Sequence, residues 1–180
     1  HRMKTIPVPA YAQGRPANKA LFDSLKKGLG MVPNLYATFA HSEHALGNYL
    51  ALQSGKSSLS AKARELINLV VSQVNACEYC LAAHTAIGKM TGYTDAQILE
   101  IRRGRASFDA RLDALARLVR NIASERGHAD PALVQAFFGA GWTEGDLVDA
   151  IVVIGDKTVT NYLHGTTQVP VDFPPAPPLR

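Results

Sequence analysis

Helix start signals recur along this chain of 180 residues, whereas the alternating patterns of strands are nearly absent. Ser60 precedes an apolar periodic stretch, and side chains of this kind cap helix N-termini. Thr94 and Gln97 have the spacing of a capping box. Asp130 is followed by a proline, which is favoured at the first helical position. The sequence therefore predicts an all-α domain, with helices over 16–29, 33–54, 60–74 and 77–92 and further helices that begin near 94, 107, 131 and 143.

Two segments share one pattern. Residues 92–100 and residues 141–149 each contain a glycine that ends a helix, an aromatic residue, a threonine cap, an acidic residue and an apolar pair. The pattern is typical of an internal helical duplication in which two related units pack together. Common capping chemistry by itself also produces such a pattern, so both explanations stay open at this point.

The two ends of the chain differ from this helical part. Residues 1–16 are polar and contain prolines, which predicts an N-terminal extension whose first residues, His1 and Arg2, resemble a cloning scar. Residues 17–166 are expected to form a single domain, and this length is enough to bury a sizeable core. Residues 167–180 are rich in proline and are expected to form an extended arm outside the core.

Charge and hydropathy argue against several classes of protein. The formal net charge is +4, but the basic residues are scattered and are not interleaved with aromatic residues, so we expect no nucleic-acid partner. No apolar run approaches the roughly 18 residues of a membrane span, and no apolar segment near the start suggests a signal peptide. We therefore expect a cytoplasmic protein without a membrane partner. Nothing in the sequence implies a haem, flavin or metal cofactor.

The only two cysteines form a compact motif with a histidine. Cys77 and Cys80 are three residues apart, and His84 follows four residues later. Because each helical residue advances by about 100°, the three side chains lie on one face of a helix. Two thiols that can close into a disulfide beside a histidine favour a redox site in a reducing compartment.

The preceding predicted helix carries a narrow polar stripe on an otherwise apolar surface. The stripe consists of Glu65, Asn68, Ser72 and Asn75. Buried polar groups need partners, and the cysteines and the histidine of the next segment can supply them. The alternative is a partly exposed helix whose polar side faces solvent.

Two other interpretations of the cysteine pair stay open. Cys77, Cys80 and His84 are zinc-ligand types, and Glu65 could be a fourth ligand. Structural zinc sites usually take a second pair of ligands from a distant segment, and the chain has no second cysteine pair. We therefore predict no metal site. A purely structural pair of buried cysteines is the other alternative.

The combined spacing resembles the motif of AhpD-like alkylhydroperoxidases: Glu65, eleven further residues, Cys77-Glu78-Tyr79-Cys80, three further residues and His84. These proteins belong to the broader carboxymuconolactone decarboxylase superfamily, and the similarity covers most of the chain. The resemblance implies an all-α, AhpD-like helical bundle. It also implies a homo-oligomer (a trimer, hexamer or dimer) with active sites near subunit contacts.

The resemblance assigns a role to each residue of the motif. Cys80 would attack the peroxide oxygen and become a sulfenic acid, and Cys77 would resolve it into a disulfide. His84 would shuttle protons, with Glu65 orienting it or sharing a proton with it. An external dithiol, which in AhpD-like proteins is a dihydrolipoyl-bearing protein, would regenerate both thiols.

One position departs from the family pattern. Peroxidases of the family carry a histidine directly before the second cysteine, where this chain has Tyr79. A tyrosine, with a pKa of about 10, cannot replace a histidine as a base at neutral pH. His84 with Glu65 is therefore the candidate proton donor. Asn161 and His164, one turn apart on the last predicted helix, are candidates for a neighbouring pocket.

The sequence thus predicts a thiol-dependent peroxidase or disulfide oxidoreductase that reduces organic hydroperoxides through a CxxC dithiol–disulfide cycle. The expected partners are an organic hydroperoxide, a dithiol reductant such as a lipoyl-bearing protein, and further copies of the chain. One alternative is a non-catalytic redox-sensing or scaffold protein. Another is a carboxymuconolactone decarboxylase-like enzyme acting on a lactone, which is disfavoured because those branches lack the redox pair.

Overall fold

The computed structural model describes residues 6–11 and 14–180 of the chain. His1 and Arg2, the predicted cloning scar, lie outside the described residues. The described part consists of α-helices without a strand, which confirms the all-α prediction. The helices are α1 (Pro16–Leu29), α2 (Asn34–Phe39), α3 (Ala45–Ser54), α4 (Ala61–Val74), α5 (Glu78–Met90), α6 (Asp95–Arg102), α7 (Ala110–Ser124), α8 (Pro131–Gly139) and α9 (Glu144–Thr167).

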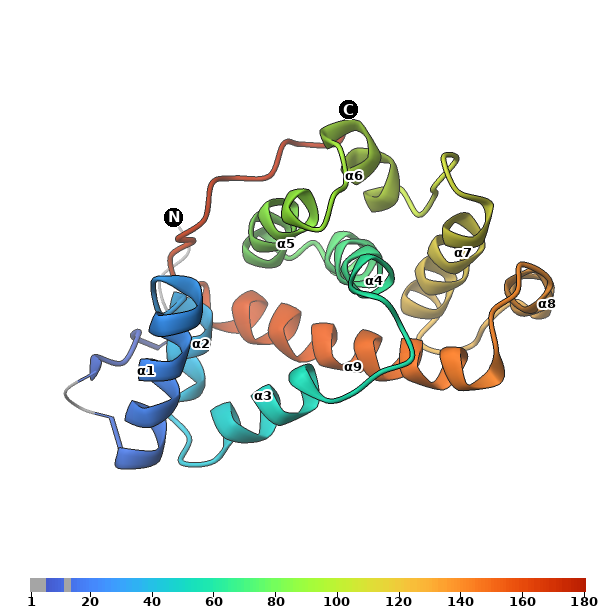
Figure 1. Cartoon of the computed structure of the whole chain (residues 1–180). Helices are drawn as coiled ribbons and strands as arrows, with labels where there is room; N and C mark the ends of the chain where they lie inside the picture. The colour runs from blue at the N-terminus through green and yellow to red at the C-terminus, as the bar shows by residue number, and fades with distance from the viewer. Residues whose placement is uncertain (1–5, 12–13) are drawn as a thin grey trace.

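Helix α4 lies in the middle of the molecule and is surrounded by α5, α6, α7 and α9 (Figure 1). Its position explains its composition, because six of its apolar side chains are fully buried: Ala63, Leu66, Ile67, Leu69, Val70 and Val71. Helices α1, α2 and α3 lie at one end of the molecule and α8 at the other (Figure 1). No helix among the described residues is long and apolar enough to cross a membrane.

Two helices, α2 and α3, replace the single helix predicted over 33–54, so that prediction was wrong. Buried Asn18 of α1 donates from Nδ2 to the carbonyl oxygens of Ala40 (3.4 Å) and Ser42 (3.1 Å). Ser42 Oγ in turn accepts from two backbone N–H groups at the start of α3. The break is therefore held by a side chain from a different helix, which local propensity does not register.

The duplicated pattern corresponds to two equivalent structures. Tyr93 donates its hydroxyl to the carbonyl oxygen of Lys62 (2.8 Å), and the ammonium of Lys62 lies 5.1 Å from the centroid of the same ring. Trp142 Nε1 donates to the carbonyl oxygen of Arg111 (2.8 Å), and the Arg111 guanidinium lies 3.9 Å from a Trp142 ring centroid. Each aromatic residue is 31 positions after its basic partner, and each basic residue is the second residue of its helix, α4 or α7.

The backbone around these aromatic residues is duplicated as well. Gly92 and Gly141 have φ angles of 106° and 99°, in the left-handed region where a residue without Cβ is favoured. Thr94 and Thr143 then form capping boxes at the starts of α6 and α9. Helices α4–α6 and α7–α9 therefore form two related three-helix units, as expected for an internal helical duplication.

The proline-rich arm crosses above α5 toward α6 (Figure 1). Asp172 accepts from the backbone N–H of Asn34 (2.8 Å), and Phe173 meets the Tyr79 ring edge-on at 5.8 Å. Further along, Arg102 of α6 donates to the carbonyl oxygen of Pro177 (2.6 Å). The arm is thus held against its own chain, directly over the helix that carries the cysteines.

Candidate active site

A tight turn between α4 and α5 places both cysteines. Ala76 has a φ of 51°. The backbone N–H of Ala76 donates to the carbonyl oxygen of Gln73 (3.1 Å), and the backbone N–H of Cys77 donates to the carbonyl oxygen of Ser72 (2.9 Å). This pair of bonds is a Schellman motif, with alanine at the position that glycine usually takes. Cys77 then becomes the N-cap of α5, and its Sγ accepts from the backbone N–H of Cys80 (3.3 Å).

The two thiols are buried and in contact. The Cys77 thiol donates to the Cys80 sulfur with 2.7 Å between the two Sγ atoms, and each residue is at most 3% exposed. Cys80 lines a cavity of the described structure, whereas Cys77 does not line that cavity. Of the pair, Cys80 is therefore the sulfur that a molecule in the cavity meets.

The same contact separates the pKa values of the two thiols. The hydrogen bond from Cys77 lowers the pKa of Cys80 to about 6, although burial acts in the opposite direction. The positive charge of Lys157 and a hydrogen bond with Asn161 contribute to the lowering. For Cys77, the hydrogen bond with Cys80 and burial raise the pKa. One proton therefore stays on Cys77 while Cys80 is a thiolate at neutral pH.

Glu65 and His84 form a buried hydrogen-bonded pair near the thiols. His84 Nδ1 lies 2.5 Å from Glu65 Oε1, and both residues are 7% exposed. Asn68 Nδ2 donates to the other carboxylate oxygen of Glu65 (2.9 Å). Burial by itself raises the pKa of Glu65, but the charge and hydrogen bond of His84, together with Asn68, outweigh it and hold that pKa below its usual value. Glu65 is thus a carboxylate that fixes the imidazole ring.

The remaining residues of the polar stripe face α9. Asn161 of α9 donates to Ser72 Oγ (3.2 Å) and accepts from Asn75 Nδ2 (3.0 Å). The stripe therefore faces neighbouring helices, and the alternative of a solvent-facing polar side does not hold for Glu65 and Ser72, which are buried. The candidate pocket residue Asn161 also reaches the site, because it hydrogen-bonds Cys80.

Tyr79 occupies the position where the peroxidase motif has a histidine, and its contacts hold the C-terminal arm against the helices. Its hydroxyl donates to Asp172 of the arm and accepts from the backbone N–H of Leu35 (3.3 Å). Burial and the hydrogen bond to Asp172 raise the pKa of Tyr79, so the phenol stays neutral. His164 packs on the Tyr79 ring at 5.2 Å, and its Nε2 lies 2.9 Å from the carbonyl oxygen of Val169. Tyr79 and His164 thus hold the arm in place.

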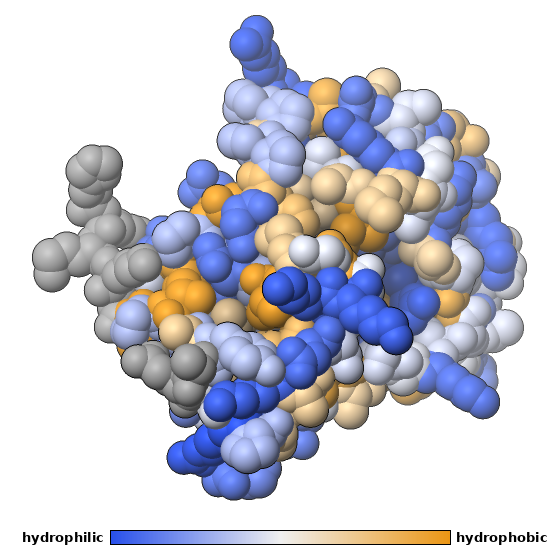
Figure 2. Space-filling view, turned by 60° about the vertical axis from the view of Figure 1, so that its left-hand side comes forward, coloured by the Kyte–Doolittle hydropathy of each residue, from blue (hydrophilic) through white to orange (hydrophobic). Residues whose placement is uncertain are grey.

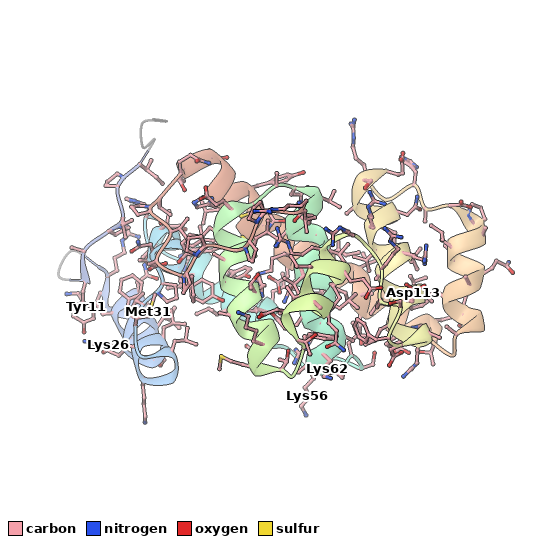
Figure 3. The ribbon with its side chains drawn as sticks, turned by 90° about the horizontal axis from the view of Figure 1, so that it is seen from above. Tyr11, Lys26, Met31, Lys56, Lys62 and Asp113 are labelled. Carbon is pink, nitrogen blue, oxygen red and sulfur yellow. The ribbon has the colours of Figure 1, made fainter. Side chains whose placement is uncertain are left out.

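A cavity of about 590 Å³ opens in front of Cys80, between α1–α3 on one side and α4, α5 and α9 on the other. Its wall is mostly apolar and includes Leu29, Met31, Leu35, Leu52, Ala83, Ile87, Val153 and Phe173. Its buried polar groups include those of Glu65, His84, Cys80, Asp156 and Lys157. Figure 3 shows two residues of its lining, Met31 beside α1 and Lys56 near one edge of the central helices. This volume suits a small organic molecule.

Lys157 is the site residue that sequence reasoning missed. It lies on α9 and is only 3% exposed, next to Asp156, which accepts a hydrogen bond from the Tyr49 hydroxyl (2.5 Å). A signal was present, because Asp156 and Lys157 follow the apolar run 151–154 on the last helix. A charged pair in such a position is unusual unless it has a partner or a function.

The predicted site residues Cys77, Cys80, His84 and Glu65 come together in one place, around the first turns of α5. Within residues 6–11 and 14–180, no three histidine, cysteine, aspartate or glutamate side chains are arranged to hold a metal ion. Glu65 is instead engaged by His84 and Asn68. The arrangement is suited to thiol chemistry with proton transfer at the cavity wall.

Comparisons with known proteins agree with this geometry. The model of the carboxymuconolactone decarboxylase family matches residues 40–121, which include α4, α5 and the whole cysteine motif. No curated protein gives a significant match to the chain.

Solved structures share the fold over almost the whole chain. An alkylhydroperoxidase AhpD core structure, an uncharacterized peroxidase-related protein from Ralstonia eutropha JMP134, is 21% identical with a TM-score of 0.84, covering 96% of this chain and 94% of that one. An uncharacterized peroxidase-related protein from Silicibacter sp. TM1040 is 24% identical with a TM-score of 0.80, covering 96% and 91%. A cysteine-to-alanine variant of the debrominase Bmp8, in complex with 2,3,4-tribromopyrrole, is 14% identical with a TM-score of 0.78, covering 94% and 93%.

Proposed function

We propose that this chain is an AhpD-like member of the carboxymuconolactone decarboxylase superfamily and a thiol-dependent oxidoreductase that reduces organic hydroperoxides. The observation that carries the proposal is the Cys77–Cys80 contact, in which one thiol keeps its proton and the other, at the cavity wall, loses it. The thiolate, and not the thiol, is the form of cysteine that attacks.

The first step consumes the peroxide. The Cys80 thiolate attacks the terminal oxygen of the hydroperoxide, an S–O bond forms, and the O–O bond breaks. Cys80 is oxidised to a sulfenic acid, and the leaving alkoxide takes up a proton to become an alcohol. A low thiol pKa raises the fraction of thiolate but lowers the nucleophilicity of that thiolate, so the two effects largely cancel. Fast peroxide reduction therefore also needs a group that protonates the leaving alkoxide.

His84 supplies that proton. Glu65 holds Nδ1 of the imidazole, so Nε2 is the ring nitrogen left to exchange protons with the substrate. His84 lines the same cavity as Cys80, which puts acid and nucleophile on one wall. General acid catalysis of this kind is worth about 10²–10⁴-fold in rate.

The second step closes the disulfide. The Cys77 sulfur attacks the Cys80 sulfenic sulfur, water leaves, and a Cys77–Cys80 disulfide forms. The two Sγ atoms already lie 2.7 Å apart, so small side-chain movements suffice. An external dithiol then exchanges with the disulfide, is itself oxidised, and returns both cysteines to thiols. A lipoyl-bearing protein in the cytoplasm fits this role as the reductant.

The proposal is tested by titrating the reduced protein with cumene hydroperoxide while free thiols and intact mass are followed. One equivalent is expected to remove both thiols and to lower the mass by two hydrogens, faster than with a free dithiol. The Cys80→Ser variant should react no faster than background, whereas Cys77→Ser should stop at the Cys80 sulfenic acid. Oxidation no faster than a free dithiol would reject peroxide reduction, and a disulfide-dependent change in assembly would then favour the redox-sensing alternative.

Assembly into a homo-oligomer belongs to the same proposal. The exposed face of α9 carries a row of apolar side chains: Val148, Ile151, Val152, Val159 and Tyr162. Apolar side chains also lie exposed among hydrophilic ones on the face shown in Figure 2. Exposed apolar surface of this kind is typical of protein contacts. Sedimentation of the wild type against Val148→Asp, at a residue that does not line the cavity, is expected to show a larger species only for the wild type.

A further inference from the structure

Lys157 is a buried cation that takes no part in the bond-making steps of the thiol chemistry. It reaches the cavity from α9, is 3% exposed, and lines the same space as Cys80 and His84. Its positive charge lowers the pKa of Cys80 more than the charge of His84 does, so its ammonium lies within electrostatic reach of the sulfur.

The other buried charged groups of the cavity have partners. Glu65 is paired with His84, and Asp156 accepts the hydrogen bond of Tyr49. Asp156 is adjacent to Lys157 on a helix, and side chains at neighbouring helical positions do not face each other. In the part of the chain that the structure describes, no hydrogen bond or ion pair holds the Lys157 ammonium, which has three protons to donate. Its charge acts at longer range and lowers the pKa of Glu65 as well as that of Cys80.

Lys157 lines the cavity, so its ammonium protons are left to water there, and a ligand carboxylate can replace that water with a charge-assisted hydrogen bond. At the edge of the cavity, Arg64 and exposed Lys56 add positive charge, while Asp149 is engaged by the backbone N–H of Ser58 (2.8 Å). The cavity wall as a whole is mostly apolar, which suits the hydrocarbon part of a ligand.

We propose that the cavity binds an amphipathic organic anion, with its carboxylate on Lys157 and its apolar body against Leu35, Ala83 and Val153. Together with the proposed function, on which this step rests, the substrate is an organic hydroperoxide that carries a carboxylate. The carboxylate sets the orientation of the molecule, and the hydroperoxide group is presented to Cys80.

Three matched hydroperoxides test the inference: cumene hydroperoxide, its para-carboxylate and its para-carboxamide. The carboxamide has nearly the shape of the carboxylate but no charge. A charge-assisted hydrogen bond predicts that wild-type kcat/KM is about ten- to hundredfold higher for the carboxylate than for the carboxamide. Lys157→Met should lose this preference, Lys157→Arg should retain part of it, and Lys27→Met, which removes an exposed charge on α1, should retain all of it. Equal kcat/KM for carboxylate and carboxamide in the wild type would overturn the inference without recourse to any variant.

A binding measurement separates this inference from the proposed function. Calorimetric titration of the reduced wild type with 4-isopropylbenzoate and with 4-isopropylbenzamide involves no peroxide. Tighter binding of the benzoate, lost in Lys157→Met and kept in Lys27→Met, would support the anion site even if peroxide reduction proved slow. Equal affinity for benzoate and benzamide would contradict the anion site even if cumene hydroperoxide were reduced rapidly.

Discussion

The two three-helix units, α4–α6 and α7–α9, are closed in the same way but contain different chemistry. In both, an aromatic residue donates to a backbone carbonyl 31 positions earlier and lies under the cation of that same residue. Only the first unit carries thiols, at the start of its second helix. The framework of the unit is therefore separable from the site that one copy of it contains.

The difference between the units begins at the second helix. In the first unit, α5 starts at the end of a three-residue turn, because Cys77 is at once part of the Schellman motif of α4 and the N-cap of α5. In the second unit, a longer loop ends at Asp130, which caps the shorter helix α8. Phe137 of α8 stacks on Trp142, with 5.6 Å between ring centroids. The second unit thus uses this helix for apolar packing, and the first uses it to hold a buried polar site.

The largest difference between the two units is expected when a histidine of each, His84 or His128, is replaced by alanine and kcat/KM is measured. His84→Ala should lower kcat/KM for cumene hydroperoxide about 10²-fold, because the leaving alkoxide loses its proton donor. His128, exposed in the loop before α8, provides the matched control. His128→Ala should leave kcat/KM unchanged, and thiol alkylation should show a similar Cys80 pKa in both variants. An unchanged rate for His84→Ala would remove His84 from the mechanism.

Smaller effects, on stability and not on rate, are expected for the shared aromatic contact. Tyr93→Phe removes one hydrogen bond and should lower the free energy of unfolding by about 1 kcal/mol. Trp142→Phe also loses ring volume against Arg111 and Phe137, so about 2–3 kcal/mol is expected. Urea unfolding measures both, and peroxide reduction should be unaltered in each. Loss of activity in Trp142→Phe, with its fold intact, would show that the two units are coupled.

The smallest effect concerns the turn that places the thiols. Ala76 has a φ of 51°, and Arg126, in the corresponding turn of the second unit, has a φ of 52°. Replacing either residue by glycine removes the strain of the left-handed conformation, which costs the folded state about 1–2 kcal/mol. Glycine also makes the unfolded chain more flexible, and this offsets part of the gain in the free energy of unfolding. Ala76→Gly and Arg126→Gly should each raise the urea midpoint slightly. A loss of stability in Ala76→Gly alone would mean that its methyl group is needed in packing.

Much of this architecture was predictable because it depends on local signals. The caps at Ser60, Thr94 and Asp130 and the one-face spacing of Cys77, Cys80 and His84 follow from neighbouring residues. The partner of His84 was also within reach, because the stripe that contains Glu65 lies on an apolar helix.

What could not be predicted depends on residues far apart in the chain. The break before α3 needs Asn18 of another helix. Helix α7 begins at Ala110 and not near 107, because Glu100 of α6 accepts the backbone N–H of Ser107. Asp109, which caps α7, is a local signal that sequence reasoning missed. Lys157 follows an apolar run, which marks its position as unusual for a charge, but only the packed fold shows that it lines a cavity.

The most direct test of the account is the pH dependence of iodoacetamide alkylation of the reduced protein, with the labelled cysteine identified by peptide mass. Because the thiolate reacts, the rate should rise with pH, reach half its maximum at about pH 6, and level off above neutrality, with the label on Cys80. A midpoint near the ordinary thiol value of about 8.5, or a label mainly on Cys77, would contradict the assignment of Cys80 as the nucleophile.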